Sequence, residues 1–195
     1  MSLNETPVSE RVQIGFLGNV NAGKSSIINA ITGQNISVVS ELKGTTTDTV
    51  KKTMELHKAG PVVLIDTPGL SDDGEIGSLR MKATMKALDS VNVAVIVTTP
   101  AETDADIEPL IKLCREKDIP YIVVCNKMDG FAGNAEDIHA DILVSAKEKT
   151  NIEELKNLLE EKIILFNESK TERFIISDKL KKNSLVTLVI PIDES

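Results

Sequence analysis

The chain has 195 residues, of which 41% are hydrophobic and only 3% are aromatic. This length suits one domain of ordinary size with a short appendage, and its core must consist mainly of Val, Ile, Leu and Ala. The net charge of −8 argues against broad binding to nucleic acids or anionic membranes. Because the chain has no run of about 18 apolar residues and no apolar N-terminal signal region, we expect a cytoplasmic protein that does not enter a membrane. Cys114 and Cys125 form no Cys-x-x-Cys pair, and we expect both to be buried free thiols.

Short apolar segments alternate with segments of helical spacing along the chain. In chain order, we predict a strand at 12–17, a helix at 25–31, strands at 50–57 and 61–65, a helix at 79–88, a strand at 91–97, a helix at 107–117, strands at 121–125 and 142–144, and a final helix with residues 152, 155, 159 and 163 on one face. Thr150 and Glu153 look like the capping box of this last helix. Strands that alternate with helices indicate an α/β fold with a mostly parallel, six-stranded sheet and helices on both faces.

The chain divides into three parts. We expect residues 1–10 to be a flexible N-terminus, residues 11–166 to form the domain, and residues 167–195 to be a linker and the start of a following domain that this chain lacks. Residues 185–190 (LVTLVI) are strongly strand-forming, and a lone apolar strand needs a partner. This segment either pairs with the sheet of this domain or opens the following domain, and we favour the second alternative.

Residues 18–25 (GNVNAGKS) fit the pattern Gly-x4-Gly-Lys-Ser between a predicted strand and a predicted helix. The glycines let the backbone curl so that successive amides and the helix N-terminus surround a phosphate. Lys24 places a positive charge between the outer phosphates, and the hydroxyl of Ser25 ligates Mg²⁺. The residues predicted to bind the nucleotide in this segment are Asn19, Val20, Asn21, Ala22, Gly23, Lys24, Ser25 and Ser26.

The sequence DTPG at residues 66–69 follows an apolar strand. Asp66 can hold Mg²⁺ through a water molecule, and the amide of Gly69 can meet the γ-phosphate and respond to its loss.

The loop GTTTD at residues 44–48 can supply a further ligand. A threonine in this loop reaches Mg²⁺ only when the γ-phosphate draws the loop in. We select Thr46, with Thr45 and Thr47 as alternatives, and we predict that Lys24, Thr46 and Gly69 take part in catalysis.

The sequence NKMD at residues 126–129 follows another predicted strand. The carboxylate of Asp129 can accept N–H bonds from N1 and the 2-amino group of guanine, and adenine offers neither donor. Lys127 can lie over the base, and Asn126 can tie this segment to the phosphate-binding segment. In Ser145-Ala146-Lys147, which follows the last predicted strand, a backbone amide can meet guanine O6.

Together these motifs resemble the translation-factor-like P-loop GTPases, within the branch that includes the tRNA-modification GTPase TrmE and Era. The resemblance covers residues 11 to about 166 and implies a three-layer, Ras-like G domain that binds GTP and GDP with Mg²⁺ and hydrolyses GTP as a molecular switch. A closer likeness, to the GTPase family of FeFe-hydrogenase maturation (HydF), rests on the stretches NAGKSSIINAITGQNISVVS, GTTTD, GPVVLIDTPGL and VTLVIPIDES.

The likeness to the hydrogenase-maturation family implies hydrogenase-maturation proteins as partners. It also implies dimerisation through a C-terminal region that is missing here. The iron–sulfur function of that family cannot be assigned to this chain, which lacks the necessary cysteines.

Leu70 follows DTPG where the Ras pattern has a glutamine that orients the attacking water, and leucine cannot do this. The tRNA-modification GTPase and its relatives use K⁺, held by an asparagine of the phosphate-binding loop and by the threonine-rich loop. Asn21 stands at the matching position, and the resemblance therefore implies that it ligates K⁺. Asp72, Asp73 and Glu75 are candidates to position the water.

Three alternatives stay open. The chain can be a GTP-gated docking module in which hydrolysis is incidental, or a different TrmE/Era-like GTPase that acts in tRNA modification or ribosome assembly. An ATP-dependent P-loop kinase is the third, and NKMD argues against it because a kinase does not need to select guanine.

Overall fold

The computed structural model describes residues 11–33, 50–69 and 84–171. The elements follow in the order β1 (Val12–Gly18), α1 (Lys24–Thr32), β2 (Val50–Leu56), β3 (Gly60–Asp66), β4 (Val93–Thr98), α3 (Asp104–Glu116), β5 (Tyr121–Cys125), the short 3₁₀ helices η2 (Met128–Gly130) and η3 (Ala135–Asp137), β6 (Ile142–Leu143) and α4 (Ile152–Thr171). Residues 84–88 are also helical. All six predicted strands are present, with bounds within two residues of those expected.

The strands form one sheet in the order β2-β3-β1-β4-β5-β6. Only β2 runs antiparallel to its neighbour, and the other four pairings are parallel. Strand β1 lies between β3 and β4, and the order of the strands reverses at this point. In sheets of this kind a crevice opens at the carboxyl end of the strand where the order reverses. The predicted α/β class is therefore confirmed, and the topology directs attention to the end of β1.

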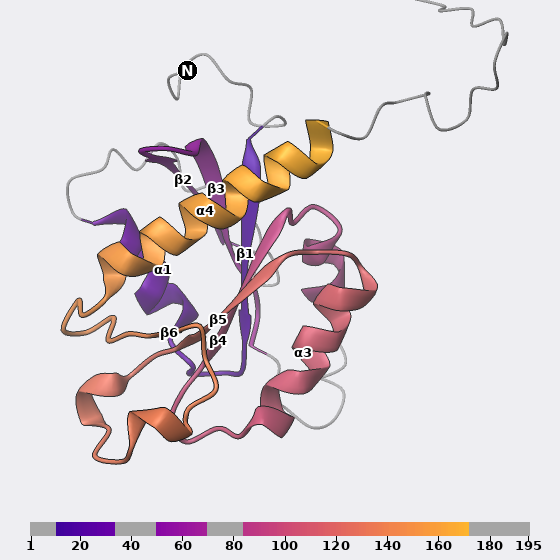
Figure 1. Cartoon of the computed structure of the whole chain (residues 1–195). Helices are drawn as coiled ribbons and strands as arrows, with labels where there is room; N and C mark the ends of the chain where they lie inside the picture. Colours follow the sequence, from indigo (N-terminus) through magenta and orange to yellow (C-terminus); the bar gives the residue numbers. More distant parts are fainter. Residues whose placement is uncertain (1–10, 34–49, 70–83, 172–195) are drawn as a thin grey trace, which may run out of the picture.

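Helices cover both faces of the sheet. Helices α1 and α4 lie on one face and α3 lies on the other (Figure 1). In β4, Val93, Val95 and Val97 belong to the core cluster under α1 and α4, whereas Ala94 and Ile96 belong to the cluster under α3. All five are fully buried, which explains why the sequence of this strand shows a continuous apolar run instead of an alternation.

Two helix starts differ from the sequence prediction. Helix α3 begins three residues before residue 107, because Thr103 and Asp106 form a capping box in which the Asp106 carboxylate accepts the Thr103 amide proton at 2.7 Å. The predicted capping box at Thr150 is wrong. The backbone of Thr150 pairs with that of Ser145. The helical hydrogen bonds of α4 begin at the Asn151 carbonyl, which accepts from the Leu155 amide at 3.1 Å.

Several predictions fall outside the described residues. These are the threonine-rich loop at 44–48, the residues from Leu70 to Glu75, the first half of the helix expected at 79–88, and the segment 185–190. Among the helices that the structure describes, none combines the length and apolar character needed to cross a membrane.

Both cysteines are buried free thiols, as predicted. Burial raises the pKa of Cys114 to about 11. It also raises the pKa of Cys125 to about 11, with a smaller contribution from the negative charge of Glu102.

We therefore predict that neither thiol reacts quickly with a disulfide reagent in the folded protein at pH 8. With a pKa near 11, only about one thiol in a thousand is ionised at that pH, and the thiolate is the reactive form. The measurement is the rate of labelling with and without guanidinium chloride. The chain denatured in guanidinium chloride should be labelled quickly at both cysteines. Rapid stoichiometric labelling of the native chain would contradict the burial of these residues.

Candidate nucleotide-binding site

We call residues 18–25, which run from the last residue of β1 into the first turn of α1, the phosphate loop. It turns sharply, with the Ala22 amide donating to the Asn19 carbonyl at 3.3 Å. Asn21 (φ 63°) and Gly23 (φ 94°) both adopt left-handed backbone conformations. Gly23 caps the N-terminus of α1 without a side-chain hydrogen bond, and the N-terminus of a helix attracts an anion such as a phosphate.

Lys24 lies inside the phosphate loop. Its side-chain nitrogen donates to the carbonyl oxygens of Gly18 at 3.1 Å and Asn19 at 2.8 Å. The residue is only 7% exposed. The ammonium is therefore fixed among the backbone groups of the loop, where its charge can act on a phosphate held by the same loop.

Asn126, at the end of β5, ties the phosphate loop to the rest of the site. Its side-chain nitrogen donates to the Ala22 carbonyl at 3.1 Å, and its side-chain oxygen accepts from the Ala146 amide at 3.1 Å. A Cβ atom at Gly23 would lie 2.2 Å from the Asn126 nitrogen, so only glycine fits this close approach. The predicted link between the two loops is present.

Ser25, in the first turn of α1, lies beside Asp66 at the end of β3. The Ser25 hydroxyl donates to the Asp66 carboxylate. Because β1 and β3 are parallel, Asp66 pairs in register with Phe16, and Thr67 is held by a 2.7 Å bond from its hydroxyl to the Phe16 carbonyl. These oxygen ligands suit Mg²⁺, which prefers oxygen donors and usually completes its shell with water and phosphate.

The described residues contain no group of three or more His, Cys, Asp or Glu that could hold a metal by itself. A hydroxyl and one carboxylate beside a phosphate cradle therefore fit Mg²⁺ as a partner of the nucleotide, and they do not form a free-standing metal centre.

Gly69 lies against the phosphate loop. A Cβ atom at this position would be 2.6 Å from both the backbone nitrogen and the Cα of Val20. The end of the DTPG sequence thus reaches the loop that is predicted to hold the phosphates, as the prediction for the Gly69 amide requires.

A cavity of about 400 Å³ lies beside the phosphate loop. It is lined by Gly23, Ser26, Asn126, Lys127, Asp129, Gly130, Ala146 and Lys147. Seven of these eight residues were predicted from the sequence. Gly130 was missed, and its position directly after NKMD is the signal that could have identified it.

The Asp129 carboxylate is already oriented in this cavity. The Ser145 hydroxyl donates to it at 2.8 Å, and the Lys147 ammonium lies 3.5 Å from its other oxygen. The hydrogen bond from Ser145 is the main cause that lowers the pKa of Asp129, against the opposing effect of desolvation, and Lys147 lowers it further. An ionised carboxylate can accept both N–H bonds of guanine. Ser145 therefore has a second role, the orientation of Asp129, that the sequence did not indicate.

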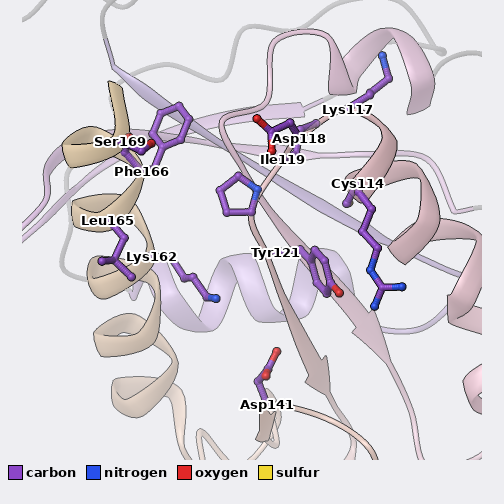
Figure 2. A pocket seen from close by; sticks show the side chains of 12 residues that line it. Cys114, Lys117, Asp118, Ile119, Tyr121, Asp141, Lys162, Leu165, Phe166 and Ser169 are labelled. Atoms are coloured by element: carbon purple, nitrogen blue, oxygen red, sulfur yellow. Dashed lines mark hydrogen bonds between the residues drawn. The ribbon is translucent and has the colours of Figure 1, made fainter. Parts of the chain in front are cut away.

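A larger cavity, of about 840 Å³, lies at the opposite end of β5. Figure 2 shows Lys162 and Phe166 of α4 on one side of this cavity and Tyr121 of β5 on the other. It contains none of the predicted site residues, and its charged lining mixes Arg115 and Lys117 with Asp118 and Asp141 among others. Volume alone would select this cavity, but the phosphate loop and Asp129 lie elsewhere.

Thr46 and Leu70 lie outside the described residues. Asn21 is exposed on the phosphate loop. The remaining predicted residues come together at the carboxyl ends of β1, β3, β5 and β6. A mostly parallel sheet with a phosphate loop, an adjacent hydroxyl and carboxylate, and an oriented guanine acceptor defines the chain as a P-loop protein with a G domain.

Comparison with known proteins agrees with this class. Residues 13–127 match the family described as 50S ribosome-binding GTPase, and the chain belongs to this family. The GTPase Der of Wolinella succinogenes is 35% identical over 139 residues, which is 66% of this chain and 29% of that protein. The tRNA modification GTPase MnmE of Aquifex aeolicus is 32% identical over 163 residues, which is 80% of this chain and 35% of that protein. The chain thus spans about a third of these curated relatives.

The fold also matches solved structures. Aquifex aeolicus Era bound to GDP and AlF₄⁻ has a TM-score of 0.61 and 21% identity, over 77% of this chain and 56% of that chain. At this identity the likeness shows the fold alone, which is the predicted Ras-like G domain.

We predict that Asp129→Asn changes the base preference from guanine to xanthine. The amide nitrogen of asparagine would face the guanine donors, whereas the 2-oxo group of xanthine can accept from it. Losing two bonds to a charged group should weaken GDP binding by about 100-fold or more. The measurement is calorimetric titration with GDP and with xanthosine diphosphate.

Asp137→Asn is the matched control, because Asp137 carries the same charge in the same connection but does not line the cavity. It should keep the preference for guanine. Retention of that preference by Asp129→Asn would show that another residue reads the base.

Proposed function

We propose that this chain binds GTP with Mg²⁺ through the site described above and hydrolyses it to GDP and phosphate as the switch domain of a larger protein. Its family membership establishes the GTPase class, and the residue assignments are ours. The observation that carries them is the Asn126 side chain, which holds the phosphate loop and the guanine cavity in one unit.

The geometry of the phosphate loop supports the proposed roles of the described residues, and the role of Thr46 rests on the sequence alone. Lys24 and the amides of the phosphate loop bind the outer phosphates, and Ser25, Asp66 (through water) and Thr46 would hold the metal. Bound Mg²⁺ would neutralise charge that develops on the phosphate oxygens. Gly69 lies close enough to Val20 for its amide to sense a γ-phosphate in the loop.

We further propose that Asn21 ligates K⁺, which would offset charge between the β- and γ-phosphates. The support is the position of Asn21 in the phosphate loop, where it is exposed and adopts a left-handed conformation at φ 63°, together with the sequence resemblance to the K⁺-dependent GTPases.

This role predicts that GTP hydrolysis is faster in KCl than in NaCl at equal ionic strength, by about tenfold or more. Asn21→Ala should remove the difference, because the ion loses its ligand from the loop. Asn134→Ala, an exposed asparagine at the start of η3, is the control and should retain it. The assay is the release of phosphate, and equal rates of the unmodified chain in both salts would defeat the role of K⁺.

For the biological process, we propose that the chain acts in RNA modification or ribosome assembly, as a GTPase related to TrmE, Era and Der. The reported relatives support this reading, since one is named as a tRNA modification GTPase and another as the GTPase Der. Hydrogenase maturation is the second candidate. None of the relatives reported above bears that name, and it is favoured only by the sequence stretches that resemble the hydrogenase-maturation family.

Deletion of the gene in its natural host separates the two processes. The first proposal predicts altered modified nucleosides in tRNA, or altered ribosome assembly, with normal hydrogenase activity. The second predicts loss of hydrogenase activity with unchanged tRNA. Restoration by the full-length gene, and not by a Lys24→Ala version, would tie the affected process to this site.

A further inference from the structure

Glu102 lies in the connection between β4 and α3, outside every motif that the sequence indicated. Its carboxylate accepts three hydrogen bonds. One oxygen accepts from the Asn19 side chain at 2.6 Å, and the other accepts from the Thr99 amide at 2.7 Å and the Thr98 hydroxyl at 3.1 Å. One acidic side chain therefore joins the end of β4 to a residue that is 83 positions away in the sequence.

Asn19 follows Gly18 in the phosphate loop, and both its backbone carbonyl and its side-chain amide form hydrogen bonds. Its carbonyl accepts from the Lys24 ammonium at 2.8 Å and from the Ala22 amide at 3.3 Å. Its side chain is held by Glu102. The residue that anchors Lys24 is thus anchored in turn by Glu102.

A carboxylate beside a loop that binds phosphates is electrostatically unfavourable, because like charges repel. Three donors that surround the Glu102 carboxylate reduce this cost, and charge-assisted bonds of this kind are about twice as strong as neutral ones. The benefit that can offset the remaining repulsion is a fixed position of the phosphate loop.

We propose that Glu102 is a positioning residue for GTP binding and hydrolysis: it holds Asn19, and through Asn19 the phosphate loop and Lys24, in the arrangement that accepts the phosphates. This inference rests on the proposed function. It requires that the geometry of the Glu102 side chain matters and that its negative charge does not.

The test compares Glu102→Ala, Glu102→Gln, Asn19→Ala and the double variant Glu102→Ala/Asn19→Ala. The control is Glu108→Ala, an exposed acid on α3 whose contact with Arg115 is a loose 3.8 Å pair. The measurements are the affinities for GDP with Mg²⁺ and for guanosine, which has no phosphate, and kcat and KM for GTP hydrolysis.

We expect Glu102→Ala and Asn19→Ala each to weaken GDP binding by about tenfold or more, the range for loss of a bond to a charged group. Because both changes remove the same hydrogen bond, the double variant should lose about as much GDP affinity as the more affected single variant. Its loss should not equal the product of the two single losses. Guanosine affinity should stay unchanged, because guanosine uses only the base cavity.

Glu102→Gln should bind GDP at least as tightly as the unmodified chain. Its amide oxygen can accept the bonds from Thr98 and Thr99, and its amide nitrogen can donate to Asn19 after that side chain turns over. Glu108→Ala should behave as the unmodified chain does.

The proposal is wrong if Glu102→Ala binds GDP normally, if the two single effects multiply, if Glu102→Gln is as weak as Glu102→Ala, or if guanosine binding falls equally. If Glu102→Ala does not fold, Glu102→Asp, with a side chain one methylene shorter, must show the same phosphate-specific loss. Failure of the unmodified chain to bind GDP would instead overturn the proposed function, so the two failures are distinguishable.

Discussion

The side-chain amide of Asn126 is the contact on which the arrangement of the site depends. It is 2% exposed and joins three loops, because its nitrogen donates to the Ala22 carbonyl and its oxygen accepts from the Ala146 amide. Leaving a buried polar group such as the Asn126 amide unpaired costs about 1–3 kcal/mol. The approach is so close that residue 23 must be a glycine. The phosphate loop and the cavity around Asp129 are therefore held together by the same side chain.

The electrostatics of the chain act at two scales. A net charge of −8 disfavours a polyanionic partner that would cover a wide surface. At short range, however, backbone amides and the buried Lys24 create a small positive site at the end of β1, and water-poor surroundings strengthen its effect. Acids next to this site are held by hydrogen bonds, as Glu102 and Asp129 show. A small positive site of this kind can hold the phosphates of a nucleoside triphosphate on a chain whose net charge is negative.

Much of the fold and site could be predicted from the sequence, because the signals are local. The apolar run of β4 and the spacing of GNVNAGKS each lie within one short segment, and the order of strands and helices then brings their ends together. Contacts between distant segments could not be predicted. Glu102 reaches Asn19 across 83 positions and has no spacing pattern around it. Ser145 orients Asp129 through a contact that only the folded sheet creates. The start of α3 was misplaced because its polar capping box precedes Ile107, the first large apolar residue of the helix.

The central claim is that loops at the carboxyl ends of β1, β5 and β6 bind one guanine nucleotide together. Its most direct test is a titration of the ¹⁵N-labelled chain with GDP and Mg²⁺, followed through backbone amide resonances. The account predicts that amides in residues 18–25, 126–130 and 145–147 shift along one shared binding curve, while those of Tyr121 and Lys162 at the opposite end of β5 do not. Shifts confined to one loop, or an equal response to ADP, would contradict it.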